Sequence, residues 1–156
     1  MRQIILALAL LAALAAPASA AEPFPARITQ GYSSHHRGID LAAHRGTTVR
    51  SIGPGIVVFA GWRNNCGGRQ VYVDMGGGWY ATYNHLGRIL TTEGAQLWTG
   101  TRLGKVGTTG CTTGPHVHLE IWHGYPWRHG SYRVRPNRWI WPAVPTTYRH
   151  AGRLTL

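Results

Sequence analysis

Three short segments of the sequence carry histidines at spacings that suit metal chemistry: His36-Arg37-Gly38-Ile39-Asp40, Tyr83-Asn84-His85-Leu86 and His116-Val117-His118. In a β-strand, residues i and i+2 point to the same face, so His116 and His118 would project side by side. Imidazole nitrogens and a carboxylate oxygen are typical zinc ligands, and a catalytic zinc site combines three protein ligands with one open position for water. Two histidines and Asp40 meet that count.

The spacing between His36 and Asp40 constrains the backbone. Four residues of extended chain span roughly 13 Å, which is too far for both side chains to bind one ion. The segment must therefore bend, and Gly38 permits a bend because glycine has no Cβ. Each signal is weak alone, since isolated pairs of this kind also occur by chance at the surface or in a core. Their combination predicts a metal site.

The composition indicates the kind of domain that must position these residues. Glycine accounts for 21 of the 156 residues, and charged residues for 13%, which is low for a globular protein. Seven tryptophans and seven tyrosines, within a hydrophobic fraction of 44%, supply enough apolar surface for a core and exclude general disorder. No long apolar stripe of period 3.6 is present. We therefore predict one all-β, mostly antiparallel domain.

Six β-rich runs are separated by glycine-rich turns. Residues 47–52 and 56–60 flank Gly53-Pro54-Gly55 and predict a hairpin. Residues 70–75 and 79–85 flank Gly76-Gly77-Gly78 and predict a second hairpin, whereas residues 101–106 and 117–122 predict two further strands.

The first twenty residues have the features of a secretory signal. Arg2 precedes an unbroken apolar run over residues 4–16, and Pro17-Ala18-Ser19-Ala20 offers a small-x-small cleavage site. The run is short for a membrane span, and no cysteine follows it that could carry a lipid. We expect a secreted or periplasmic protein without a membrane anchor, cleaved near Ala20, with a domain over residues 21–122.

Residues 123–156 differ from the rest, because tryptophans and tyrosines alternate with arginines. We expect an irregular aromatic and arginine-rich C-terminal extension, packed on or beside the domain. Its aromatic faces could stack on sugar rings, but aromatic side chains more often pack against a sheet.

The cysteines and the net charge indicate the compartment and the binding partners of the protein. Cys66 and Cys111 are the two cysteines of the chain, and in an exported protein an even count favours a disulfide, although two small buried residues remain the alternative. The formal net charge of +11 suits anionic cell-wall polymers, or it serves only solubility. No helix-turn-helix, basic zipper or zinc-finger spacing points to nucleic acid. A monomer is the simplest expectation.

The segment from His36 to Trp122 resembles the lysostaphin-type, or LytM-like, zinc metallopeptidases of bacterial peptidoglycan. The resemblance depends on blocks that occur in the family's order: His36-x-Gly38-x-Asp40, Gly46-Thr47-Thr48-Val49, Gly55-Ile56-Val57-Val58-Phe59-Ala60-Gly61-Trp62, Tyr83-x-His85-Leu86, Gly107-Thr108-Thr109-Gly110 and Thr113-Gly114-Pro115-His116-Val117-His118-Leu119-Glu120. The resemblance implies a compact peptidase domain with a β-sheet core like that of duplicated hybrid motifs.

The resemblance also implies roles for individual residues. His36, Asp40 and His118 would hold one zinc ion, while His116 and His85 would line the site as catalytic histidines, with their division of labour left open. Tyr83 lies two residues before His85, on the same face of the expected strand, where it would donate a hydrogen bond to the oxyanion or simply pack as an aromatic side chain. Glu120 would not bind the metal itself but would orient one of the histidines.

Three functions are compatible with these features. The first is a zinc metalloendopeptidase that hydrolyses cross-bridge or stem-peptide bonds of peptidoglycan through a zinc-activated water. The second is a non-catalytic LytM-like protein that binds cell wall or activates another hydrolase. The third is a basic binder of nucleic acid or polysaccharide, which would explain the charge but not the motifs. The complete set of five site residues favours the enzyme.

Overall fold

The computed structural model describes residues 25–136, and these form strands and loops without a helix. The predicted signal sequence and residues 137–156 lie outside the described residues. The strands run in chain order as follows: β1 (Arg27–Gln30), β2 (Ile39–Ala42), β3 (Thr48–Arg50), β4 (Gly55–Arg63), β5 (Gly68–Gly76), β6 (Trp79–Asn84), β7 (Leu86–Ile89), β8 (Gln96–Leu97), β9 (Arg102–Val106), β10 (His116–His123) and β11 (Tyr132–Val134).

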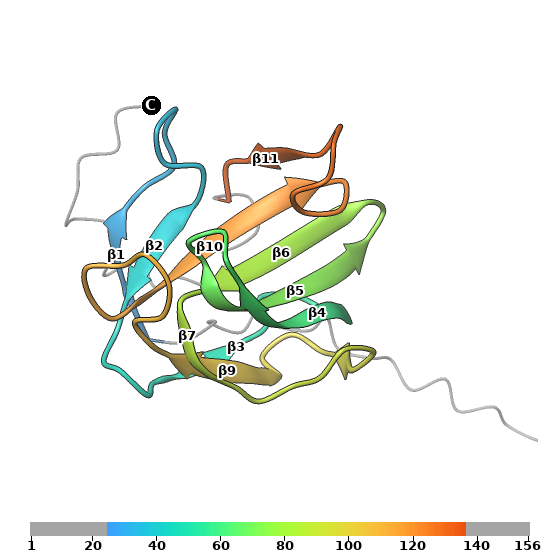
Figure 1. Ribbon diagram of the computed structural model, residues 1–156. Helices are drawn as coiled ribbons and strands as arrows, with labels where there is room; N and C mark the ends of the chain where they lie inside the picture. The colour runs from blue at the N-terminus through green and yellow to red at the C-terminus, as the bar shows by residue number, and fades with distance from the viewer. Residues whose placement is uncertain (1–24, 137–156) are drawn as a thin grey trace, which may run out of the picture.

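The strands form two sheets, and every strand pair is antiparallel (Figure 1). The large sheet has the order β1-β2-β10-β6-β5-β4-β8, and the small sheet has the order β3-β9-β7. Among the described residues, no helix is long and apolar enough to pass through a membrane. The predicted all-β, mostly antiparallel fold is confirmed.

One face of the large sheet supplies the hydrophobic core. Along β10, Val117, Leu119 and Ile121 are fully buried, and they belong to the same apolar cluster as Leu103 and Val106 of the small sheet. Because side chains alternate along a strand, His116, His118 and Glu120 occupy the opposite face. The core therefore fixes the direction in which the histidines project.

The second predicted hairpin is present, whereas the first is not. β5 and β6 pair across Gly76-Gly77-Gly78, whose positive φ angles of 84°, 62° and 80° suit glycine. β3 pairs with β9 and β4 pairs with β5 and β8, so the turn around Pro54 connects the two sheets. The prediction of a hairpin at Gly53-Pro54-Gly55 was wrong because local turn signals cannot distinguish a hairpin from a crossover between sheets.

β11 extends the large sheet beyond the boundary predicted at residue 122. β2 pairs with His116–Leu119 of β10, while β11 pairs with Ile121–His123 on the same edge. β6 occupies the other edge of β10 over residues 118–123. Residues 132–134 of the predicted irregular extension thus form a strand of the main sheet, which places residue 133 close to the histidine face.

Candidate metal and catalytic site

A row of polar side chains crosses the large sheet on the face opposite the core. His118 of β10 is in register with Asp40 of β2 on one side and with Asn84 of β6 on the other. Directly opposed residues of an antiparallel pair share a face, so these three side chains lie side by side. The sheet register therefore brings together residues that are 78 positions apart in the sequence.

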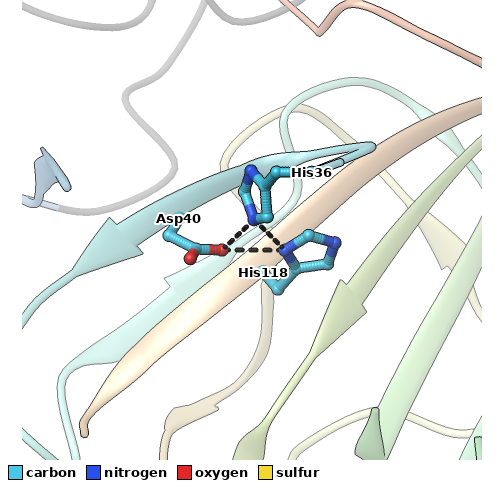
Figure 2. Close-up of side chains that lie close together, drawn as sticks. All are labelled: His36, Asp40 and His118. Atoms are coloured by element: carbon cyan, nitrogen blue, oxygen red, sulfur yellow. Dashed lines mark hydrogen bonds and ion pairs between the residues drawn. The ribbon is translucent and has the colours of Figure 1, made fainter. Parts of the chain in front are cut away.

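Three candidate ligand atoms converge at this row (Figure 2). Asp40 Oδ1 lies 2.7 Å from His118 Nδ1 and 3.1 Å from His36 Nε2, and the two nitrogens are 3.0 Å apart. Asp40 and His118 come from strands, whereas His36 comes from the loop before β2. Two imidazole nitrogens and one carboxylate oxygen at this separation are a donor set that zinc prefers.

Gly38 lies in the bend between His36 and Asp40, and its lack of a side chain leaves room for the His118 ring. A Cβ at residue 38 would lie 2.7 Å from Cε1 and Nε2 of His118 and 2.7 Å from the Leu119 carbonyl oxygen. Any larger residue would push the His118 ring away. The sequence argument attributed the glycine to backbone freedom, whereas its role in the structure is close packing against a candidate ligand.

The outer nitrogen of each candidate ligand histidine is already hydrogen-bonded. His36 Nδ1 lies 2.8 Å from the carbonyl oxygen of Gly31, which can only accept, so this nitrogen carries the proton. His118 Nε2 lies 3.3 Å from Oε1 of Glu120. Both inner nitrogens can therefore present a lone pair toward Asp40, which is how metal-binding histidines are usually held. The residues fit a zinc ion.

His85 and His116 lie beside the three ligand side chains, with ring centroids 4.7 Å apart. Their Nδ1 atoms lie 2.8 Å and 2.9 Å from the carbonyl oxygens of Thr109 and Gly114, so both donate there. Both Nε2 atoms remain available to accept a proton, and His116 Nε2 is 3.6 Å from Asp40 Oδ1. Two imidazoles with accessible Nε2 atoms next to the ligand cluster can act as general bases or, once protonated, as hydrogen-bond donors.

His85 reaches the site because the chain leaves the strand at this residue. β6 ends at Asn84, and His85 adopts a left-handed φ of 64° while its backbone N–H donates to Gly67 over 2.8 Å. The strand alternation that would pair His85 with Tyr83 on one face is therefore broken. In the part of the chain that the structure describes, the non-glycine residues with positive φ are Cys66, His85 and Trp127, and all three line the cavity described below.

Tyr83 does not face the site. Its side chain is 1% exposed within the core, and its hydroxyl accepts a hydrogen bond of 2.9 Å from the backbone N–H of Ile52. Burial raises the pKa of Tyr83 to about 12. The suggested role of Tyr83 as an oxyanion donor was wrong because Tyr83 projects from the opposite face of β6, and the alternative of a packed aromatic is what the structure contains.

Burial and neighbouring charges shift the pKa values of three site residues: those of Asp40 and His85 are lowered, and that of His118 is raised. Burial disfavours the ionised Asp40, but the hydrogen bond and charge of His118 outweigh burial and lower the pKa of Asp40. Burial also disfavours the charged form of His118, yet hydrogen bonds with Asp40 and Glu120 raise its pKa to about 9 in the metal-free site. Burial lowers the pKa of His85, which keeps that imidazole neutral.

The site lies in a cavity of about 680 Å³. Its walls include all five predicted site histidine and aspartate residues, together with Glu120, Cys66 and Cys111, which the sequence had also singled out. They further include three residues that the sequence had not indicated: Asn84, Arg133 and Trp127. His35 also lines the cavity, but it is exposed. His44 and His129 are exposed, and His123 packs between Trp79 and Tyr132.

Cys66 and Cys111 form the predicted disulfide. The bond joins the β4–β5 loop to the β9–β10 loop, and the Cys111 N–H donates to the Cys66 carbonyl oxygen over 2.8 Å. The second of these loops also carries Thr109 and Gly114, whose carbonyl oxygens hold His85 and His116. The disulfide thus fastens the loop that orients the two histidines.

Sequence reasoning missed the carbonyl groups of Thr109 and Gly114, as well as Arg133, Asn84 and Trp127. Backbone carbonyls carry no residue-type signal, although both lie in the glycine and threonine blocks noted above. The aromatic and arginine-rich composition after residue 122 was the available signal for Trp127 and Arg133, but composition cannot indicate which side chains turn toward a cavity.

Comparisons with known proteins agree with this geometry. The model of peptidase family M23 matches residues 34–132. The peptidoglycan DD-endopeptidase ShyA of Vibrio cholerae is 39% identical over 87 residues, which cover 55% of this chain and 20% of that protein. Lysostaphin of Staphylococcus simulans is 34% identical over 99 residues, which cover 63% of this chain and 20% of lysostaphin. The chain thus matches only about a fifth of the length of these two relatives.

Solved structures share the fold. The structure of lysostaphin from Staphylococcus simulans superposes with a TM-score of 0.69 at 27% identity, covering 84% of this chain and 54% of that one. The catalytic domain of the prophage-encoded protein EnpA from Enterococcus faecalis gives a TM-score of 0.67 at 31% identity, covering 76% of this chain and 95% of that domain.

Proposed function

The chain belongs to peptidase family M23, and we propose on this basis that it is a zinc metalloendopeptidase that hydrolyses peptide bonds of bacterial peptidoglycan. The observation that carries the proposal is the convergence of His36 Nε2, Asp40 Oδ1 and His118 Nδ1, with His85 and His116 beside them. A chain that had become a non-catalytic wall binder would have no need to retain all five side chains.

The side chains divide the chemistry between them. His36, Asp40 and His118 would hold one zinc ion, which when bound supplies Lewis-acid polarisation of a carbonyl and a water of lowered pKa. His85 and His116, each with Nδ1 bonded to a carbonyl oxygen and Nε2 free to accept, would take the proton of the attacking water. The same imidazole, once protonated, can donate to the oxyanion that develops on the substrate carbonyl and then to the leaving amine.

The substrate follows from the relatives rather than from a feature of the cavity. One is a peptidoglycan DD-endopeptidase, and another, ALE-1 of Staphylococcus capitis, is a glycyl-glycine endopeptidase. We therefore propose cross-bridge or stem-peptide bonds of peptidoglycan as the substrate class. The net charge of +11 would favour anionic cell-wall polymers as additional contacts.

We further propose that the protein acts outside the cytoplasm. The disulfide supports this location, because such bonds persist in oxidising compartments. Residues 21–122 would form the peptidase domain, to which β11 adds a strand.

The proposal is tested by quantifying zinc in the purified protein and digesting peptidoglycan with and without a chelator, followed by mass analysis of the products. We expect about one zinc per chain and chelator-sensitive release of new amino termini. Binding to several wall types without new termini would instead identify a non-catalytic wall binder or hydrolase activator.

A further inference from the structure

Arg133 of β11 connects an aromatic pair to the carboxylate behind the metal site. Its Nη1 atom donates to Glu120 Oε1 over 3.0 Å, and the two groups form an ion pair. Its guanidinium carbon lies 4.5 Å from the ring centroid of Trp122 and 4.6 Å from that of Trp127. The guanidinium is therefore held by two indoles while it binds a carboxylate.

Glu120 transmits this contact to His118. Its side chain is only 2% exposed, and Oε1 is shared between Arg133 Nη1 and His118 Nε2. The second oxygen, Oε2, accepts from the Thr82 hydroxyl at 3.1 Å and from the Trp122 indole N–H at 2.9 Å. With both oxygens engaged, the carboxylate has one orientation, and that orientation directs His118 Nδ1 toward Asp40.

Arg133 is the cationic partner that makes the buried Glu120 carboxylate tolerable. An ionised carboxylate that loses its charged partner in a buried position is costly, and it responds by moving toward solvent. This movement would displace the acceptor that faces His118 Nε2. The position of a candidate metal ligand therefore depends on a residue of β11, one position beyond the segment that matches the family.

The conformation of Trp127 indicates that the surrounding structure maintains the contacts that Arg133 makes with the two indoles and with Glu120. Trp127 has a φ of 67°, which is strained for a bulky side chain, and its indole lies 5.0 Å from that of Trp122 although it remains 40% exposed. Strained residues persist when the surrounding structure requires them, and they concentrate at functional sites. Here the strained residue contacts the Arg133 guanidinium.

We propose that Arg133 is a positioning residue of the metal site, acting through Glu120 on His118 and held in place by Trp122 and Trp127. The proposal depends on the proposed function only in taking His118 as a zinc ligand. It assigns to the segment after β10 a task in metal binding that is separate from any contact with substrate.

The test compares Arg133→Met with the matched control Arg128→Met. Methionine retains apolar bulk against the indoles but removes the charge and the donor, whereas Arg128 lies over the Tyr125 ring, 4.8 Å away, in the β10–β11 connection. Zinc affinity is measured by chelator competition, and the visible absorption of the cobalt-substituted protein reports ligand geometry. We expect Arg133→Met to raise the zinc Kd about tenfold or more and to shift the cobalt spectrum, with Arg128→Met unchanged.

A zinc Kd and a cobalt spectrum identical to those of the parent protein would overturn the proposal, even if KM for peptidoglycan rose, because that pattern describes a substrate contact only. Should Arg133→Met not fold, Arg133→Lys takes its place. A lysine ammonium has no planar face to stack on the indoles, so the Kd should still rise about threefold or more, and an unchanged Kd overturns the proposal. Parent protein that binds zinc but leaves peptidoglycan intact would reject the proposed function without affecting this test.

Discussion

His118 and Asp40 face each other directly across the β10–β2 pair, with Nδ1 of the histidine 2.7 Å from Oδ1 of the aspartate. Two of the three candidate zinc ligands are thus fixed by the hydrogen-bond ladder of the sheet, which leaves little freedom in their separation. The third, His36, lies in a loop and is held by its hydrogen bond to Gly31. This arrangement leads to several measurable expectations.

Removal of a ligand should abolish zinc binding and hydrolysis together. Asp40→Ala and His118→Ala each reduce three ligands to two, and such a site holds zinc poorly. Metal analysis of the purified variants should find little zinc, with no release of new amino termini from peptidoglycan. His129→Ala, an exposed histidine outside the cavity, is the control and should keep both. Full zinc occupancy in both ligand variants would refute the assignment.

Removal of either neighbouring histidine should separate metal binding from turnover. His85→Ala and His116→Ala leave the three ligands in place, so zinc should remain near the parent level. Loss of a general acid–base group should lower kcat by about 10²- to 10⁴-fold. Metal content and steady-state hydrolysis measure the two effects, with the exposed His44→Ala as the matched control. If either variant hydrolyses peptidoglycan at the parent rate, the substituted histidine has no catalytic role.

Opening the disulfide should affect the histidines more than the metal. The Cys66→Ser, Cys111→Ser double variant frees the loop whose carbonyl oxygens orient His85 and His116. We expect a lower kcat with zinc retained, and a loss of stability of roughly 2–5 kcal/mol. Kinetics, metal analysis and thermal unfolding test this expectation, which fails if the double variant keeps the parent kcat.

Zinc affinity should depend on pH through His118. The pKa of His118 is raised to about 9 in the metal-free site, so below that pH the residue carries a proton that zinc must displace. The affinity should therefore increase as the pH rises from 6.5 toward 9, with proton release on binding. Calorimetry in buffers of different ionisation enthalpy counts the released protons. A pH-independent zinc Kd over this range would contradict the expectation.

Tyr83→Phe should change stability without changing catalysis. The variant leaves the buried N–H of Ile52 without its acceptor, which costs about 1–3 kcal/mol. The melting temperature should fall, while kcat and KM measured well below it should match the parent values. A large fall in kcat at full folding would restore the oxyanion role that the buried position argues against.

The sequence alone was sufficient for the strand-based half of the site. The alternation rule correctly assigned His116 and His118 to one face, and the distance argument required the bend between His36 and Asp40. Both inferences use local geometry, which a short motif specifies.

The remaining half depends on features that local patterns do not specify. His85 turns at a left-handed residue after β6, so the period-2 rule misassigned Tyr83. The contact of Arg133 with Glu120 requires β11 to pair with the far end of β10, and strand pairing beyond a composition change cannot be read from spacing.

The position of the Cys66–Cys111 bond makes the fixing of the proposed catalytic histidines depend on the redox state of the compartment. In a reducing compartment the chain would already possess its three zinc ligands, but the loop that aims the two histidines would be unfastened. Oxidation after export would complete the catalytic half in the compartment that contains the cell wall. For the proposed extracytoplasmic peptidase, the loop would be free to move during synthesis and would be fixed only once the disulfide forms.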